Sequence, residues 1–307
     1  MTKKSFSPCK PICKGNTTTC RPYPLKYIHS KITYTVKRSL YCLLFSITLS
    51  STTHAVILYS GENNANLTAP DTAREAAFNS VAKVSNEDGT SIVGSAVHIK
   101  GKYLLTAEHV IHKGVTPRRG HVTFDGVEYK AIDMDFLPIQ IGSADLVLFK
   151  LIENPDLPDT PLYSSSNEGF RTGILIGWGK GRDSTQANQA GTTRNWIRGD
   201  GSNILKRWGT NRIETITTTT LPYHYLRTQL DSDQGNDEAA IALYDSGSGL
   251  FVFKSGTWQL AGITAAATNA STSRFSFSYP DSNYFVRISQ YKQSILSNIP
   301  DLPRLGY

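Results

Sequence analysis

Three polar residues occupy positions from which their side chains could carry out chemistry together. His109 follows one short apolar segment, Asp145 opens another, and Ser246 stands between Asp245 and Gly247 just before a third. Histidine titrates near neutral pH and suits general base work, a carboxylate can orient the imidazole, and a serine activated by a base is a nucleophile. Each residue alone also fits an ordinary structural role, so the inference depends on all three.

The order of these residues along the chain distinguishes them from similar sets. Subtilisins have the order Asp, His, Ser, and α/β-hydrolases have the order Ser, acid, His. Here the order is His109, Asp145, Ser246, with T-A-E-H ending at His109 and D-S-G-S-G around Ser246. Together with G-W-G at 177–179 and W-Q-L-A-G-I at 258–263, these motifs resemble the chymotrypsin/trypsin-like serine peptidases, in the form of secreted bacterial members that lack disulfides.

The resemblance implies a serine endopeptidase that uses neither a cofactor nor a metal ion. Ser246 would attack a peptide carbonyl, His109 would take its proton, and Asp145 would hold the imidazole tautomer. Water would then hydrolyse the acyl-enzyme. The backbone N–H groups of Tyr244 and Ser246 would stabilise the oxyanion, and the implied partner is a peptide or protein substrate.

Tyr244 departs from the family pattern, which has glycine at this place. The usual backbone conformation there is costly for a residue with a Cβ atom. One alternative is therefore a catalytically silent homologue that binds a peptide or protein in the same cleft. A second alternative is a β-barrel adhesin or binding protein that is not a peptidase, in which the order of the three residues is a coincidence.

Small side chains are predicted to border the substrate pocket. Counting six residues back from Ser246 places Ala240 at the position that usually sets specificity in this family, and Ala265, Ala266 and Ala267 would form the opposite wall. These residues predict a preference for apolar or small side chains. A small insertion would instead bring Glu238 or Asp237 to the pocket and favour basic side chains.

An acidic segment at 231–238 admits two interpretations. Its oxygen ligands could hold Ca²⁺, but the spacing lacks the full EF-hand pattern. A solvated acidic loop is the simpler interpretation, and no metal site is predicted.

The basic residues that raise the net charge to +7 are concentrated at the N-terminus. Residues 1–55 contain nine lysines and arginines, no acidic residue and all four cysteines. The other 252 residues contain 23 basic and 25 acidic residues, a net charge of −2, which argues against nucleic acid as a partner. Without cysteine, this part of the sequence has no disulfide, thiolate ligand or cysteine nucleophile.

Residues 1–55 are predicted to be a leader that contains a secretory signal peptide. Lys37 and Arg38 precede the apolar segment Ser39–Ser51, which is too short to span a membrane because a spanning helix needs about 20 apolar residues. The residues before Ala55 are small enough for cleavage after it. We expect a secreted or periplasmic protein with no membrane attachment after cleavage, and an uncleaved anchor is the alternative.

Cleavage after Ala55 would create a new N-terminus at Val56. In the family that the sequence resembles, the aspartate before the nucleophile commonly pairs with a newly formed apolar N-terminus. The resemblance therefore implies that Asp245 pairs with the Val56 amine, so that export itself activates the enzyme.

The sequence from Val56 onward alternates short apolar segments with Gly, Asn, Asp, Ser and Pro, which is typical of an all-β protein. We predict a monomer with two antiparallel six-stranded β-barrels, at 56–162 and 163–300, and a tail at 301–307. A closing α-helix is predicted at Val286–Ser297. The predicted strands are Ser91–Ile99, Tyr103–Thr106, His121–Phe124, Asp145–Leu151, Gly173–Trp178, Arg212–Thr218, Gly249–Phe253, Trp258–Thr264 and Tyr284–Ile288.

Overall fold

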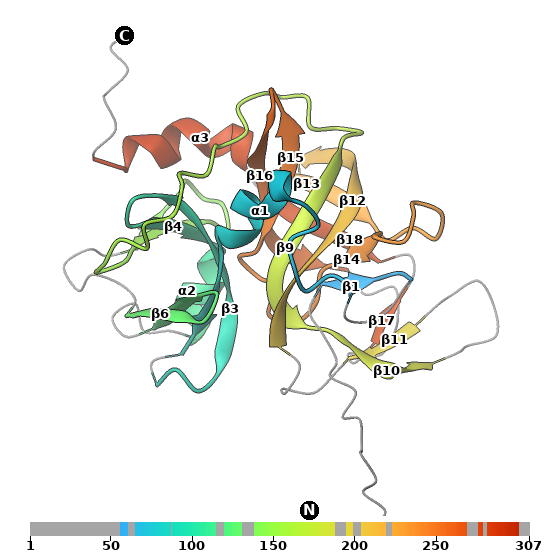
Figure 1. The fold of residues 1–307 in the computed structure, drawn as a ribbon. Coiled ribbons are helices and arrows are strands. Elements are labelled where there is room, and N and C mark those ends of the chain that lie inside the picture. Colours follow the sequence, from blue (N-terminus) through green and yellow to red (C-terminus); the bar gives the residue numbers. More distant parts are fainter. Residues whose placement is uncertain are drawn as a thin grey trace, which may run out of the picture. The chain divides into compact units, whose positions relative to one another are not determined.

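The fold was analysed in a computed structural model of the chain (Figure 1). The predicted leader and the predicted tail lie outside the residues that the structure describes. None of the helices in the described part is long and apolar enough to cross a membrane. The described residues are 56–60, 65–86, 88–114, 120–130, 138–187, 195–198, 204–218, 223–268, 276–278 and 281–300.

The first half of the protein is a seven-stranded antiparallel sheet with the strand order β6-β5-β2-β3-β4-β8-β7, drawn from teal to green in Figure 1. Helix α1 precedes β2, and its N-terminus is capped by Asp71, which accepts a hydrogen bond from the Arg74 N–H at 2.9 Å. The elements are α1 (Thr72–Asn79), β2 (Val81–Ser85), β3 (Ile92–Lys100), β4 (Tyr103–Thr106), α2 (Glu108–Gly114), β5 (His121–Phe124), β6 (Val127–Lys130), β7 (Ile139–Gln140) and β8 (Val147–Lys150).

The second half is a closed antiparallel barrel with the order β12-β13-β18-β16-β15-β9. A two-stranded sheet, β1 with β14, and a three-stranded sheet, β10-β11-β17, accompany the barrel, and helix α3 follows β18 (Figure 1). The elements are β1 (Ile57–Leu58), β9 (Thr172–Lys180), β10 (Arg182–Ala187), β11 (Asn195–Arg198), β12 (Ile204–Thr218), β13 (His224–Gln229), β14 (Ala239–Ala240), β15 (Gly249–Lys254), β16 (Thr257–Ala267), β17 (Ser276–Ser278), β18 (Ser282–Arg287) and α3 (Ile288–Ser297).

The structure confirms the predicted fold class, a mostly-β protein with a six-stranded barrel and a C-terminal helix. The first half differs in detail: its end strands β6 and β7 are not paired in the described residues, and the segment between them, 131–137, lies outside those residues. Helix α3 begins at Ile288 and not at Val286, because β18 continues to Arg287. The short helices α1 and α2 were not predicted from the sequence.

One apolar cluster continues from the first half into the second. It contains Val97 and Leu104 of the sheet together with Ile263 and Val286 of the barrel, all with no exposed surface. A polar contact joins the halves as well, because the buried Lys206 ammonium donates to Asp125 at 2.8 Å. The two halves therefore share one core, which fixes the site that lies between them.

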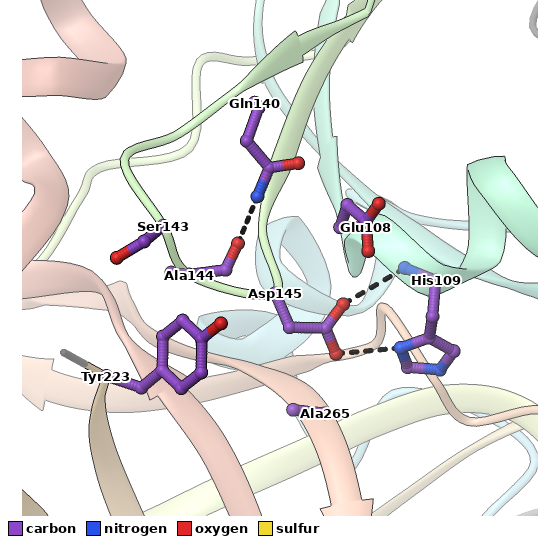
Figure 2. A pocket seen from close by; sticks show the side chains of 8 residues that line it. All are labelled: Glu108, His109, Gln140, Ser143, Ala144, Asp145, Tyr223 and Ala265. Atoms are coloured by element: carbon purple, nitrogen blue, oxygen red, sulfur yellow. Dashed lines mark hydrogen bonds and ion pairs between the residues drawn. The ribbon is translucent and has the colours of Figure 1, made fainter. Parts of the chain in front are cut away.

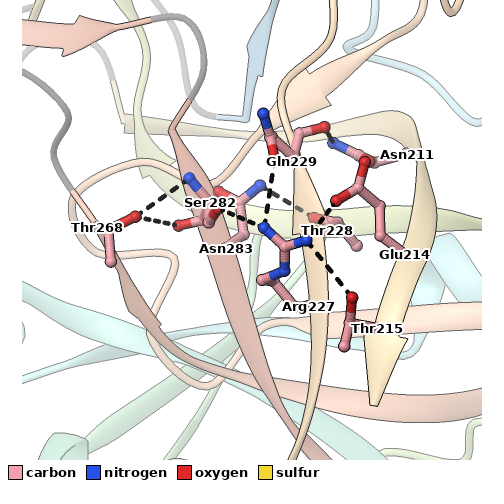
Figure 3. A network of polar contacts seen from close by, with 9 residues as sticks. All are labelled: Asn211, Glu214, Thr215, Arg227, Thr228, Gln229, Thr268, Ser282 and Asn283. Atoms are coloured by element: carbon pink, nitrogen blue, oxygen red, sulfur yellow. Dashed lines mark hydrogen bonds and ion pairs between the residues drawn. The ribbon is translucent and has the colours of Figure 1, made fainter. Parts of the chain in front are cut away.

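A polar network holds three barrel strands together (Figure 3). The Arg227 guanidinium donates to Glu214 at 2.8 Å and to Ser282 at 3.3 Å, and so connects β13 with β12 and β18. Asn283, which is fully buried, accepts a hydrogen bond from the Ile241 N–H at 3.1 Å. These contacts hold β18 against the start of the loop that carries Ser246.

Candidate active site

The structure brings His109, Asp145 and Ser246 together. Strands β4 and β8 pair with Thr106 opposite Val147, so the residues after β4 and before β8 lie side by side. His109 Nδ1 lies 2.7 Å from Asp145 Oδ2, and the His109 backbone N–H donates to Asp145 Oδ1 at 3.0 Å (Figure 2). His109 Nε2 lies 2.8 Å from Ser246 Oγ, which comes from the loop between β14 and β15.

These contacts define the tautomer that the imidazole needs to act as a base. An ionised carboxylate only accepts hydrogen bonds, so Nδ1 of His109 carries the hydrogen toward Asp145. Nε2 is then left to accept the proton of the Ser246 hydroxyl. The His109 and Asp145 side chains are 28% and 23% exposed, so the pair remains open to a substrate.

Tyr244 adopts the backbone conformation that usually requires glycine, with φ of +76°. The Leu243 carbonyl accepts a hydrogen bond from the Lys180 N–H at 2.7 Å. Since a trans peptide is planar, the Tyr244 N–H points away from that contact. Among the residues that the structure describes, no acceptor contacts the N–H of Tyr244 or of Ser246. The two groups are therefore available as donors to an oxyanion.

Ser95 supports this loop from the first half and was missed by the sequence analysis. Its N–H donates to the Ser246 carbonyl at 2.8 Å, and its hydroxyl accepts from the Trp178 N–H at 3.0 Å and lies 3.5 Å from the Tyr244 carbonyl. Gly247 is required beside it, because a Cβ atom there would lie 2.1 Å from the Ser95 carbonyl oxygen. A polar residue in the middle of a predicted apolar strand was the available signal.

The loop that carries Ser246 also contains Asp245, whose side chain is fully buried. Its Oδ2 accepts a hydrogen bond from the Ala242 N–H at 2.6 Å, and its Oδ1 has no hydrogen-bond partner among the described residues. Burial raises the pKa of Asp245 to about 7, although the Ala242 and Val56 N–H groups and the Arg207 guanidinium act in the opposite direction. Gly177 makes room for this carboxyl group, since a Cβ atom there would lie 2.3 Å from Oδ1.

Val56 and Arg207 are the two neighbours of Asp245 that carry, or could carry, a positive charge. Val56 is buried at the start of β1, where the next residue, Ile57, pairs with Ala240. Arg207 is 1% exposed, and burial lowers its pKa to about 9. The Val56 N–H therefore lies close enough to Asp245 to lower its pKa, and the structure adds a buried guanidinium that the sequence analysis did not identify.

The alanines predicted to border the substrate pocket lie in different surroundings. Ala265 is partly buried, and Ala266 and Ala267 are exposed at the end of β16. Ala240 does not reach an open surface, because it is 1% exposed and pairs with Ile57. The residue count placed Ala240 at the pocket without allowing for this added strand.

The acidic segment 231–238 forms no metal centre in the described part of the chain, where no group of three or more His, Cys, Asp or Glu side chains is placed to hold an ion. Glu238 turns inward and accepts a hydrogen bond from the Asp231 N–H at 3.1 Å. Burial raises the pKa of Glu238 to about 8, so this carboxyl group is largely protonated at neutral pH.

A pocket of ≈ 640 Å³ adjoins the histidine and the aspartate (Figure 2). Residues from both halves line it, so it lies across the junction that the shared core creates. The lining residues are Glu108, His109, Gln140, Ser143, Ala144, Asp145, Tyr223 and Ala265.

The fold and the site define the protein as an antiparallel β protein with a hydrogen-bonded Ser–His–Asp set at the junction of its halves. No family model matches the chain, and no curated protein matches it. The chain is similar to a solved structure of the HtrA-type protease AlgW with a decapeptide. That similarity has a TM-score of 0.49 and 20% sequence identity, and it covers 75% of this chain and 67% of that chain.

Proposed function

We propose that the protein is a serine endopeptidase that cleaves peptide bonds through an acyl-enzyme. One observation carries the proposal: a single imidazole lies between a carboxylate at 2.7 Å and a serine hydroxyl at 2.8 Å. In this arrangement His109 takes the proton of Ser246 as the oxygen attacks the carbonyl, and Asp145 stabilises the imidazolium. His109 then protonates the leaving amine, and an attacking water repeats the sequence to release the acid.

The backbone around Ser246 supports this chemistry. The carbonyl oxygen of the substrate becomes negatively charged during attack, and donors fixed in advance lower the energy of that state. The N–H groups of Tyr244 and Ser246 have no other acceptor in the described residues, and Lys180 and Ser95 hold the carbonyls on either side of Tyr244. No step of this mechanism requires a cofactor.

A fluorophosphonate tests the proposal, because such a reagent reacts with a serine that has both a base and an oxyanion site. The full chain is expressed and purified as exported, treated with the reagent, and examined by intact mass. We expect one adduct, absent in the Ser246→Ala variant. A folded protein with an authentic mature N-terminus that gains no adduct would contradict the proposal.

The alternative function is a catalytically silent homologue that binds a peptide in the same cleft. The strain at Tyr244 favours it, because the left-handed conformation costs a residue with a Cβ atom about 1–2 kcal/mol. A loop that relaxes from this conformation would lose the Tyr244 N–H as a donor. Peptide binding without a fluorophosphonate adduct would support this alternative. An adduct on Ser246 would rule it out.

We further propose that the chain is exported and that the leader is removed after Ala55. The free Val56 amine would then lie beside the buried Asp245 and complete the support of the oxyanion loop. The burial of Val56 and its effect on the pKa of Asp245 support this idea. N-terminal sequencing tests it: a mature protein that begins well beyond Val56 and remains active would contradict it.

A further inference from the structure

Two buried hydroxyl groups that the proposed reaction does not use contact each other near Ser246. One belongs to Ser248, two residues after the nucleophile, and the other belongs to Thr264 of β16. Ser248 Oγ lies 2.7 Å from Thr264 Oγ1, and the two residues are 2% and 1% exposed. This distance is typical of a hydrogen bond between hydroxyl groups, and burial keeps bulk water from competing for it. The pair therefore joins the chain just after Ser246 to strand β16.

Backbone hydrogen bonds make the same connection. The Gly247 N–H donates to the Thr264 carbonyl at 2.9 Å, and the Thr264 N–H donates to the Ser248 carbonyl at 2.9 Å. From the first half of the protein, the Ser95 N–H donates to the Ser246 carbonyl at 2.8 Å. Thr264 is therefore the residue of β16 that holds the chain immediately after the nucleophile.

Thr264 also lies where β16 departs from regular pairing with β18. Thr264 pairs with Phe285, and Ala266 pairs with the residue before Phe285, so β16 has one extra residue at Ala265. An extra residue of this kind bends a strand and turns a side chain in a new direction. Ala265 lines the pocket that His109 also lines (Figure 2). Thr264 therefore connects the loop that carries the nucleophile with the pocket wall beside the base.

We propose that the hydroxyl pair of Ser248 and Thr264 positions the reacting groups, by holding the loop that carries Ser246 in register with the bulge at Ala265. The Ser246 hydroxyl has to stay within reach of His109, and a displacement of about 1 Å can lower a reaction rate by about 100-fold. Thr264 suits this role because a β-branched side chain has a restricted χ1 angle. The inference rests on the proposed peptidase function and adds two positioning residues to it.

Two variants of the full chain, purified as exported, separate positioning from stability. Thr264→Val keeps the shape of the side chain but leaves the buried Ser248 hydroxyl without its partner, so the protein unfolds at a lower urea concentration. A double variant, Ser248→Ala with Thr264→Val, removes both hydroxyl groups. Its urea midpoint returns close to that of the wild type, because no member of the pair is left unsatisfied.

Activity is expected to follow a different pattern from stability. In both variants the fluorophosphonate labels Ser246 about tenfold more slowly than in the wild type, because the loop has lost its connection to β16. For an internally quenched peptide that the wild type cleaves, kcat falls by a similar factor and KM changes little. A pair that only stabilised the fold would instead give a double variant with normal labelling.

Two further substitutions in β16 are the controls. Thr264→Ser keeps the hydroxyl group, so labelling of Ser246 stays close to that of the wild type. Thr257→Val makes the same chemical change as Thr264→Val at the exposed start of the strand, and it alters neither stability nor labelling. If Thr264→Ser loses as much activity as Thr264→Val, the methyl group and not the hydroxyl group is responsible, and the inference is wrong.

The outcomes separate this inference from the proposed function. A double variant that recovers labelling together with stability overturns the inference, and so does unchanged labelling in Thr264→Val. In both cases the wild type still reacts at Ser246, and the peptidase function stands. If Ser246 of the wild type gains no adduct, the proposed function fails, and the inference fails with it.

Discussion

Two aspartates contact the region around Ser246, and their surroundings differ. Asp145 is 23% exposed, and both of its oxygens accept hydrogen bonds from His109. Asp245 has no exposed surface, and its Oδ1 has no partner among the described residues. Asp145 therefore has a donor at each oxygen and remains open to solvent. The buried carboxylate lacks a full set of donors, so its charge depends on pH and on nearby cations.

The Arg207 guanidinium is a cation close to Asp245, and its presence does not depend on removal of the leader. Arg207 lies close enough to lower the pKa of Asp245, while its Nε and Nη2 atoms have no hydrogen-bond partner among the described residues. An amine at Val56 would add a second positive charge beside Asp245. Under the proposed cleavage after Ala55, the state of Asp245 would connect the processing of the chain to the loop that carries Ser246.

The largest expected effect is the loss of activity in Asp145→Asn, the change at the partly exposed aspartate. In Asp145→Asn the amide cannot select the tautomer with hydrogen on Nδ1, so kcat falls by about 10⁴-fold. Steady-state kinetics and the rate of fluorophosphonate labelling measure the loss, with Glu153→Gln at an exposed position after β8 as the control. A loss below tenfold would show that Asp145 is not the partner that His109 needs.

The raised pKa of the buried Asp245 is tested through the pH dependence of the free energy of unfolding. The pKa of Asp245 is about 7 in the folded protein against 3.8 for an ordinary aspartate, so the folded state binds more protons between those values. The free energy of unfolding then decreases as pH rises from about 4 to about 7. Relative to Asp245→Asn, the unprocessed chain loses roughly 4 kcal/mol over this range.

Urea unfolding at a series of pH values measures this difference. In the processed chain, an ammonium group at Val56 lowers the pKa of Asp245, so the same decrease is smaller. Equal pH profiles for the processed and unprocessed chains would contradict the pairing of Val56 with Asp245.

A smaller effect is expected from Ser95, the residue of the first half that supports the loop carrying Ser246. Ser95→Ala leaves the Trp178 N–H without its partner, which costs about 1–3 kcal/mol of stability. It also lowers kcat more than it raises KM, because the oxyanion donors lose part of their support. Urea unfolding and kinetics measure both changes, and Ser91→Ala at the exposed start of the same segment is the control. Unchanged kcat would show that the hydroxyl does not position the loop.

The smallest effect is expected at Tyr244. Tyr244→Gly relieves about 1–2 kcal/mol of backbone strain. Glycine is also more flexible in the unfolded chain, which offsets about 0.5–1 kcal/mol of that gain. The net change expected in urea unfolding is a stabilisation of about 0 to 1.5 kcal/mol. The Lys180 ammonium lies over the Tyr244 ring, with Nζ 5.7 Å from the ring centroid. A clear loss of stability in Tyr244→Gly would show that this cation–π contact outweighs the backbone strain.

The sequence predicted the elements that local composition determines. Short apolar segments marked nine of the eighteen strands in the described residues. The order of His109, Asp145 and Ser246 predicted a set that the structure brings together. Strand pairing accounts for this success, because residues that precede and follow paired strands must lie close together.

Contacts between distant strands could not be predicted in the same way. Ser95 supports Ser246 across a separation of about 150 residues, and its polar side chain in an apolar segment does not indicate which distant residue it contacts. Arginine is a residue type that sequence reasoning places at the surface, yet the Arg207 side chain is buried. A residue count cannot show that Ala240 pairs with Ile57 of β1 and is buried there. Tertiary packing decides all three.

The apolar cluster shared by both halves has a consequence for how the chain comes apart. Cutting the connection near Leu162 would expose the surfaces of Val97 and Ile263 to water on the separate pieces. Neither piece would then keep a complete core, and each would carry only part of the site. The halves therefore behave as one cooperative unit, and two such fragments would regain labelling of Ser246 only when they are mixed and refold around each other.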